Sequence, residues 1–347
     1  MLLPSSYCCC KRGLLLAALA LFFTSGGAAQ VTSGPPPSPT PPPSATSQPD
    51  LSGASAGSQQ EEPPANDDGS VFVFKKQVEE VVLHATVQDE QRRLVTDLDR
   101  TAFSVLEDGV PQTITSFRRE DVPVAMGIVI DNSGSMREKR ATVNQAVLDL
   151  IRASNPADEI FVVNFGTAFY LDQDFTSDTN LLRSALQRVS ASGTTALYDA
   201  VVASDQHLTR AARLSKRVLL VITDGQDNAS QETLREAVLR LQQDKNGPAL
   251  YAIGLHSDDP RHSGTTALET LAAGTGGIAF LPQSLSEVDT IARSIAHDVR
   301  SQYSIGYKST NARTTGYRSI QVDARARTYG RLTVLTRHGY NAGEAVH

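Results

Sequence analysis

Residues 124–135 read VAMGIVIDNSGS, in which an apolar run leads directly into an aspartate and two serines. The run from Val124 to Ile130 predicts a buried strand, because a short continuous apolar run is typical of one. Open α/β sheets bind their ligands at the carboxyl ends of their strands. Asp131, Ser133 and Ser135 are therefore expected at a ligand-binding edge, where one carboxylate and two hydroxyls suit a hard cation.

Two later segments extend this pattern. Ser192 to Thr195 places hydroxyls in a loop before a helical stretch, and Val218 to Thr223 is a second apolar strand that ends on Asp224. Aspartate-x-serine-x-serine, threonine and aspartate in this order resemble the metal-ion-dependent adhesion site, and residues 124–298 resemble a von Willebrand factor type A domain. The resemblance implies a metal site made of Asp131, Ser133, Ser135, Thr195 and Asp224.

The choice of threonine is left open by one departure from the family pattern. Gly193, Thr194 and Thr195 stand where the family has two glycines and a threonine, so the second glycine is missing. The alignment favours Thr195, and Thr194 is the alternative. Taken alone, the aspartate and serines after the first strand also fit a simple helix N-cap.

The chemistry of these residues indicates the ion and its use. Oxygen ligands with few formal charges suit Mg²⁺ or Mn²⁺, which keeps water molecules in an octahedral shell. In the family that the chain resembles, the hydroxyls bind the ion directly or through water, and the aspartates mainly hold its water molecules. One position stays open for an acidic side chain of a protein partner. The resemblance implies a metal-dependent protein-binding module for adhesion or scaffolding, and not an enzyme.

Two other functions compete with binding. A metal-dependent hydrolase would use Ser133 or a metal-bound water, but the serines lie in no G-x-S-x-G motif and no histidine falls in these segments. The chain also has no P-loop, no G-x-G-x-x-G motif and no H-E-x-x-H motif. The other alternative is a structural domain whose ion stabilises the fold.

Two weaker signals have ordinary structural explanations. One loop could bind a transition metal, although a solvated loop explains its composition as well; its residues are His256, Asp258, Asp259 and His262. Asn228 begins a glycosylation acceptor sequence, but a glycan beside Asp224 would obstruct a partner. Asp227 and Asn228 are therefore expected to act as hydrogen-bonding groups at the same edge.

The N-terminus predicts export. Lys11 and Arg12 precede an apolar stretch at 14–23, and small residues follow as far as Ala29, so residues 1–29 are predicted to be a cleaved signal peptide. The stretch is shorter than the roughly 20 residues that span a bilayer, so the mature chain is expected to have no membrane span. A periplasmic, cell-surface or secreted location follows. Cleavage removes all three cysteines and takes the net charge from −6 to −8, which argues against nucleic acid as a partner.

Composition divides the rest of the chain. Residues 30–70 are rich in proline, serine and acidic residues and predict a disordered linker. Residues 71–120 and 301–347 alternate apolar and polar residues as β-strands do, whereas residues 121–300 alternate strands and helices. The predicted fold is α/β, with a doubly wound, mostly parallel sheet in the type A domain at 121–300. The two flanking segments are expected to pair into one antiparallel β module, because the ends of a type A domain lie close together.

Within residues 121–300 the apolar periodicity predicts the individual elements. Strands are expected at 159–165, 218–223, 250–254 and 278–281, with an edge hairpin near 168–175. Helices are expected at 139–153, 181–189, 197–212, 232–243, 266–273 and 285–299. Residues 95–98, 103–109 and 337–340 also resemble the terminal regions of VWFA-related exported bacterial proteins.

Overall fold

The structure is a computed structural model that describes residues 80–119, 121–188, 191–255, 264–311 and 315–343. All of these residues belong to the second of two compact units, residues 73–347. The predicted signal peptide, the predicted linker and the loop with His256 and His262 lie outside the described residues. Within the described part of the chain, no helix is both long enough and apolar enough to cross a membrane.

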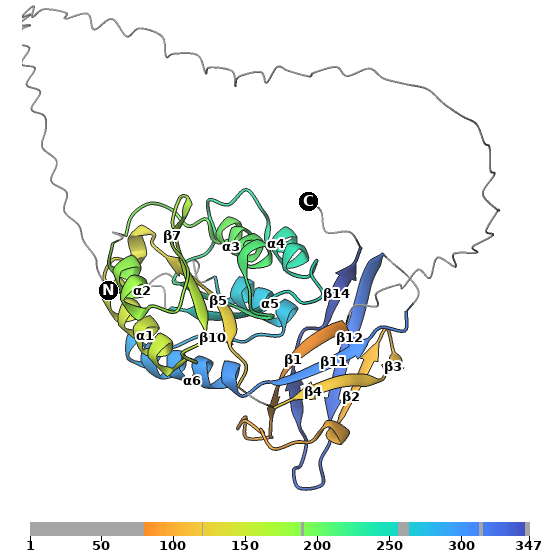
Figure 1. Ribbon diagram of the computed structural model, residues 1–347. Coiled ribbons are helices and arrows are strands. Elements are labelled where there is room, and N and C mark those ends of the chain that lie inside the picture. The colour runs from red at the N-terminus through yellow and green to blue at the C-terminus, as the bar shows by residue number, and fades with distance from the viewer. Residues whose placement is uncertain (1–79, 120, 189–190, 256–263, 312–314, 344–347) are drawn as a thin grey trace, which may run out of the picture. The chain divides into compact units, whose positions relative to one another are not determined.

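A six-stranded sheet forms the centre of the α/β unit, in the order β10-β9-β8-β5-β6-β7 (Figure 1). The first five strands in this order run parallel, and β7 pairs antiparallel with β6 at the edge. The strands are β5 (Val124–Asp131), β6 (Glu159–Phe165), β7 (Phe169–Thr176), β8 (Lys216–Thr223), β9 (Ala249–Gly254) and β10 (Ala279–Phe280).

Helices cover both faces of this sheet, because its central strands are apolar on both sides. All eight residues of β5 are buried. One face packs against α1 (Arg140–Ala153), α2 (Thr179–Gln187) and α6 (Val288–Arg300). The other packs against α3 (Leu197–Ala211), α4 (Leu234–Leu241) and α5 (Thr265–Thr275). Gly127 in β5 admits the Phe161 ring, since a Cβ there would lie 2.3 Å from it.

Two parallel neighbours flank β5, namely β6, which follows it along the chain, and β8. The chain therefore reverses its direction of winding between β5 and β8. In doubly wound sheets this switch point opens a crevice at the carboxyl ends of the strands, which is where ligands bind. The fold thus places the ends of β5 and β8 at the position expected for a site.

Strands from both flanks of the α/β unit form two four-stranded sheets, β13-β1-β11-β4 and β14-β12-β2-β3. Both sheets are antiparallel and share one apolar core. The strands are β1 (Glu80–Gln88), β2 (Phe103–Glu107), β3 (Val110–Gln112), β4 (Ile114–Arg118), β11 (Tyr303–Lys308), β12 (Gly316–Ala324), β13 (Thr333–Leu335) and β14 (Gly339–Ala342). The predicted fold class, including the antiparallel β module, is confirmed.

The chain enters and leaves the α/β unit through paired strands. β4 ends at Arg118 just before β5, and β11 begins at Tyr303 just after α6. Ser304 of β11 lies opposite Arg118 of β4, so the two connections start side by side.

A tight turn joins β2 to β3. Asp108 and Gly109 in this turn adopt positive φ angles of 50° and 77°, as a type I′ hairpin requires.

Several predicted elements differ from the structure at their ends, most of them by one or two residues. The strand expected at 278–281 covers only Ala279 and Phe280, which pair with β9 at the edge of the sheet. The helix expected from residue 285 begins with a 3-10 turn at Leu285–Glu287, and α6 proper starts at Val288. Apolar periodicity marks an amphipathic helix but is insensitive to the geometry of its first turn.

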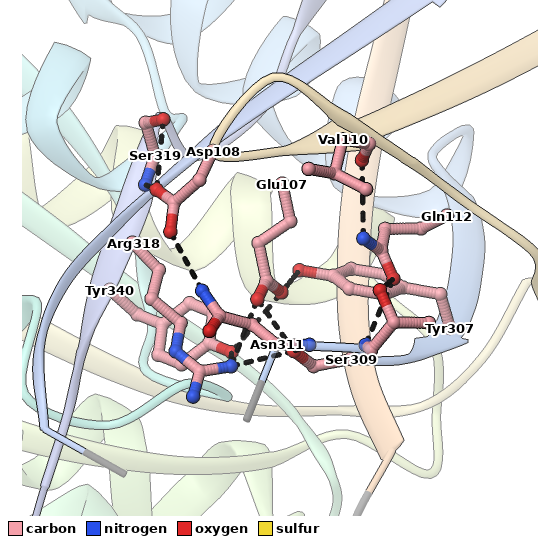
Figure 2. Close-up of polar contacts among 11 residues, drawn as sticks. Glu107, Asp108, Val110, Gln112, Tyr307, Ser309, Asn311, Arg318, Ser319 and Tyr340 are labelled. Carbon is pink, nitrogen blue, oxygen red and sulfur yellow. Dashed lines mark hydrogen bonds and ion pairs between the residues drawn. The ribbon is translucent and has the colours of Figure 1, made fainter. Parts of the chain in front are cut away.

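A buried carboxylate joins the two sheets of the β module (Figure 2). Glu107 of β2 is 1% exposed, and its Oε1 accepts hydrogen bonds from Arg318 Nη1 at 2.9 Å and from Ser309 Oγ at 2.5 Å. Its Oε2 accepts from the Tyr307 hydroxyl at 2.7 Å and from the Tyr340 hydroxyl at 3.3 Å. Since Tyr307 lies in β11 and Arg318 in β12, the carboxylate bonds to both sheets.

We predict that Glu107→Ala lowers the free energy of unfolding by about 3 to 5 kcal/mol, because it removes the carboxylate from a buried ion pair. Urea unfolding of the full chain measures this. Glu90→Ala is the control, since Glu90 is an exposed acidic residue of the same module and should change stability by no more than about 1 kcal/mol. Equal losses in the two variants would contradict the assigned role of Glu107.

The segment after α4 makes polar contacts to the β module. Arg337 donates to the carbonyl oxygen of Asp244 at 2.9 Å, and the backbone N–H of Asn341 donates to that of Gln242 at 2.8 Å. Asp205 of α3 lies near these groups and is 9% exposed. Burial, together with the negative charge of Asp244, raises the pKa of Asp205 to about 7, against the opposing effect of Arg217 and Arg337.

This raised pKa predicts a pH dependence of stability. The folded chain keeps a proton on Asp205 that the unfolded chain releases near pH 3.8, so this stabilisation is full below that pH and is lost as the pH rises through about 7. Asp205→Asn removes the effect. Relative to the wild type, the variant should gain about 2 to 3 kcal/mol more at pH 8 than at pH 5. Urea unfolding at both pH values tests this, and an equal change at both would refute it.

Candidate metal site at the carboxyl edge of the sheet

The candidate site begins where β5 and β8 end. The two strands pair in parallel with Ile130 opposite Ile222, so Asp131 and Thr223 are neighbours. After β5 the chain forms a 3-10 turn at Gly134–Met136 and enters α1. The Met136 side chain is fully buried, which anchors the turn that carries Ser133 and Ser135.

Hydrogen bonds connect four of the five predicted residues. Asp131 Oδ1 accepts from the backbone N–H of Ser133 at 2.7 Å. The hydroxyl oxygens of Ser133 and Ser135 lie 3.1 Å apart, and Ser135 Oγ donates to Asp224 Oδ1 at 2.8 Å. The structure therefore brings Asp131, both serines and Asp224 together at one edge.

Thr195 is the fifth predicted residue and lies at the same edge. A Cβ added to Gly225 would lie 3.4 Å from Thr195 Oγ1, so this hydroxyl is adjacent to the backbone that follows Asp224. Thr195 is 4% exposed. Thr194 is exposed instead, and its hydroxyl bonds to that of Thr167 at 3.0 Å. Of the two threonines, Thr195 is the one beside the segment that carries Asp224.

The loop after β8 is tied to the start of α3 by its own polar residues. Asn228 exchanges two hydrogen bonds with the backbone of Thr195, at 2.9 and 3.0 Å. Asp227 accepts from the backbone N–H of Tyr198 at 3.0 Å and from the Ser230 hydroxyl at 2.5 Å. Asp227 and Asn228 are thus hydrogen-bonding groups at this edge, as the sequence predicts, and they fix the position of Thr195 relative to Asp224.

Three residues that the sequence analysis did not single out complete the site. Thr223 Oγ1 donates to Asp131 Oδ2 at 2.5 Å and accepts from the Gly225 N–H at 3.1 Å. Lys139 Nζ lies 2.5 Å from Asp224 Oδ2. Arg140 Nη1 donates to the carbonyl oxygen of Asp131 at 3.1 Å. In the sequence, Thr223 stands out only because it ends a predicted strand, and Lys139 only because it follows the two serines. Neither feature is specific enough to predict a site residue.

Burial dominates the electrostatics of this edge. Asp131 is fully buried, and burial raises the pKa of its carboxyl, while the hydrogen bonds from Thr223 and Ser133 oppose that rise. Burial also lowers the pKa of Arg140 to about 10, so its guanidinium stays charged near neutral pH. The site is therefore a partly desolvated cluster in which opposite charges interact more strongly than they would in water.

The donor set fits a small hard cation. In an octahedron of ligands about 2.0 to 2.1 Å from Mg²⁺, neighbouring oxygens lie about 2.9 Å apart. The 3.1 Å between the two serine oxygens is close to that separation. Among the described residues, no group of three His, Cys, Asp or Glu side chains is placed to hold a metal. A site at this edge would therefore depend on neutral hydroxyls for part of its ligands.

The geometry defines a class of domain: a doubly wound α/β sheet with serine, threonine and aspartate oxygens gathered at its switch point. A family model described as the von Willebrand factor type A domain matches residues 126–226, which run from β5 to just beyond Asp224. Over these residues the α/β unit is similar to a von Willebrand factor type A domain. No curated protein sequence matches the chain.

Solved structures with similar folds include three of differing coverage. A von Willebrand factor type A protein from Catenulispora acidiphila is 14% identical, covers 78% of this chain and 75% of its own, and has a TM-score of 0.45. The vWF domain of the type V pili tip protein Mfa5 from Porphyromonas gingivalis is 14% identical over 52% of this chain and 97% of its own, with a TM-score of 0.41. Proximal thread matrix protein 1 from the mussel byssus is 17% identical over 52% of this chain, with a TM-score of 0.44. The match covers 49% of the length of that matrix protein, so the chain spans about half of it.

We predict that Thr223→Val lowers the free energy of unfolding by about 1 to 3 kcal/mol, because it removes the hydroxyl that bonds to buried Asp131 and to the Gly225 N–H. Thr194→Val is the matched control, since its hydroxyl is exposed, and it should cost no more than about 0.5 kcal/mol. Urea unfolding compares the two. A control variant as unstable as Thr223→Val would argue against this hydrogen bond as an organiser of the site.

Proposed function

We propose that the type A domain binds one Mg²⁺ or Mn²⁺ at this edge and uses it to capture a carboxylate of a protein partner. Ser133, Ser135 and Thr195 would supply hydroxyl oxygens to the ion. Asp131 and Asp224 would hold its water molecules and orient the serine hydroxyls. When bound, the ion supplies an electrophilic centre that an acidic side chain can complete.

The observation that supports this proposal most is the arrangement of the two serine hydroxyls. They lie 3.1 Å apart beside Asp224, in a turn anchored by buried Met136. A site with such preformed spacing needs little rearrangement to accept an ion, and preorganisation favours binding. Since the hydroxyls are neutral, they would leave much of the ion's charge for a partner's carboxylate.

Binding is a better-supported function than hydrolysis. A serine nucleophile needs a base within hydrogen-bonding reach. Ser135 donates to Asp224, and no histidine in the described part of the chain bonds to the hydroxyl of either Ser133 or Ser135. The carboxylate oxygens of Asp224 are already engaged by Ser135 and Lys139. The second candidate function is a structural role, in which the ion only stabilises the fold. Metal-dependent capture of a partner would distinguish the binding function from this structural role.

The predicted signal peptide supports a function outside the cytoplasm. We propose an exported adhesion or scaffold module that acts in the periplasm, at the cell surface or after secretion. The acidic mature chain fits a partner whose surface is basic or mixed in charge around the carboxylate that it presents.

The metal-binding part of the proposal predicts the effect of Thr195→Ala. Loss of one hydroxyl ligand should weaken Mg²⁺ binding by about tenfold or more, by analogy with the loss of groups that orient metal ligands. Thr194→Ala, one residue earlier in the exposed part of the loop, should leave the Mg²⁺ affinity unchanged. Isothermal titration calorimetry with Mg²⁺ measures both. If Thr194→Ala weakens Mg²⁺ binding and Thr195→Ala does not, Thr194 is the ligand and the assignment of Thr195 is wrong.

Partner capture tests the rest of the proposal. In a pull-down from envelope and secreted fractions, chelator should release the partner from the wild type, and Thr195→Ala should retain less partner than Thr194→Ala. Once chelator is present, the two variants should behave alike. Capture that survives both chelator and Thr195→Ala would place the interaction surface elsewhere and overturn the adhesion function, whether or not the ion binds.

A further inference from the structure

A lysine of the chain itself forms an ion pair with one of the two carboxylates of the site. Asp224 is nearly inaccessible, with 1% of its side chain exposed, and both of its oxygens are engaged. Oδ1 accepts from Ser135 at 2.8 Å, and Oδ2 lies 2.5 Å from the ammonium of Lys139. The side chain of Lys139 is itself only 17% exposed. The ion pair is therefore largely shielded from solvent.

The position of Lys139 in the helix does not explain its presence there. It is the N-cap residue of α1, which runs for 14 residues. The positive end of the helix dipole lies at this terminus, where a cation is unfavourable and a polar cap such as serine or aspartate is preferred. Lys139 makes no side-chain cap. Its ammonium reaches across to the end of β8, so its favourable interaction is with the site.

The formal charges of the described groups can be counted. Asp131 and Asp224 contribute two negative charges, and Lys139 contributes one positive charge. Arg140 contributes a second positive charge, because it interacts with Asp131 more strongly than with Asp172, to which Asn164 links it. The site therefore carries a net charge of about zero over its described residues.

This count changes what a divalent ion does to the site. A dication gives the site a net charge of +2, and a desolvated cluster with uncompensated charge is unfavourable. A carboxylate from a ligand lowers this charge to +1. Without Lys139, the same dication would leave a net charge of +1, so the site would bind the ion more tightly alone and would gain less from a ligand carboxylate.

We propose that Lys139 couples the two binding events, so that the site takes a divalent cation weakly alone and more tightly together with a monoanionic carboxylate. This inference rests on the proposed metal site and specifies how its occupancy is regulated. The coupling is reciprocal, since an anion that strengthens metal binding is itself bound more tightly when the metal is present. Lys139 acts on the affinity of the site through Asp224 and is a positioning residue.

Calorimetric titration of the full chain with Mg²⁺, in sodium chloride and in sodium acetate at equal ionic strength, tests the coupling. Acetate is the carboxylate probe. In the wild type, acetate should lower the Kd for Mg²⁺ severalfold. Lys139→Met should bind Mg²⁺ about tenfold more tightly than the wild type in chloride, because a nearby positive charge has been removed, and its Kd should respond less to acetate than that of the wild type.

Two further variants control for charge and for place. Lys139→Arg keeps the positive charge and should behave as the wild type in both salts. Arg137→Met removes a neighbouring cation that is exposed and whose guanidinium faces the carbonyl oxygen of Ala191 at 3.5 Å. It should leave both the Kd and its acetate response unchanged. If Arg137→Met had as large an effect as Lys139→Met, the effect would come from general surface charge and not from Lys139 in particular. That result would overturn the inference.

The inference and the proposed metal site fail in different ways. If the wild type binds Mg²⁺ but Lys139→Met shows the same Kd and the same acetate response, Lys139 does not couple the two events and the inference is wrong. If the wild type binds no Mg²⁺ in either salt, the proposed metal site itself is wrong. Lys139→Gln, which can still donate to Asp224 without a charge, repeats the test in case Lys139→Met does not fold, and thermal unfolding checks the fold of each variant.

Discussion

The parallel pairing of β5 with β8 is the constraint on which the rest of the site depends. It brings the ends of two strands that are far apart in the sequence to one edge, with Asp131 beside Thr223 and Asp224 just beyond. Both strands are buried, so a shift in their register would exchange the side chains that pack on the two helix-covered faces and would disrupt both. The same apolar packing that stabilises the sheet therefore fixes the spacing of the polar groups at its edge.

The β module imposes a second constraint, because the α/β unit is inserted between strands that pair. β4 leads into the unit and β11 leads out of it, and the two lie side by side. Each flanking segment depends on the other for its partners, since β1 pairs with β11 and β2 pairs with β12. Glu107 then fixes the two sheets together through groups of β11, β12 and β14. The strands of the module therefore come from both flanks of the α/β unit.

The chemistry of the candidate site is that of neutral oxygens among balanced charges. Two serine hydroxyls and a threonine hydroxyl lie with two carboxylates, and one of these carboxylates pairs with Lys139. A cluster of carboxylates would hold a cation strongly without any ligand from outside. An arrangement with few formal negative charges instead leaves an ion partly uncompensated, which suits a site that acts by binding a partner's anion. Thr223 and Asn228 fix the positions of two of these residues. Thr223 donates a hydrogen bond to Asp131, and Asn228 accepts one from the backbone N–H of Thr195.

The sequence by itself determined the architecture and most of the residues of the candidate site. Hydrophobic runs that end on polar residues identify buried parallel strands and their carboxyl ends, so Asp131, Ser133, Ser135 and Asp224 could be predicted to share one edge. Periodicity of two in the flanks likewise predicted an antiparallel module. Only the tertiary structure decided between Thr194 and Thr195 as neighbours of Asp224, and only it revealed the bonds from Thr223 to Asp131 and from Lys139 to Asp224. The physical reason is range: a local pattern records how a segment meets solvent and core, whereas these contacts join side chains that are distant in sequence and depend on how the strands pair.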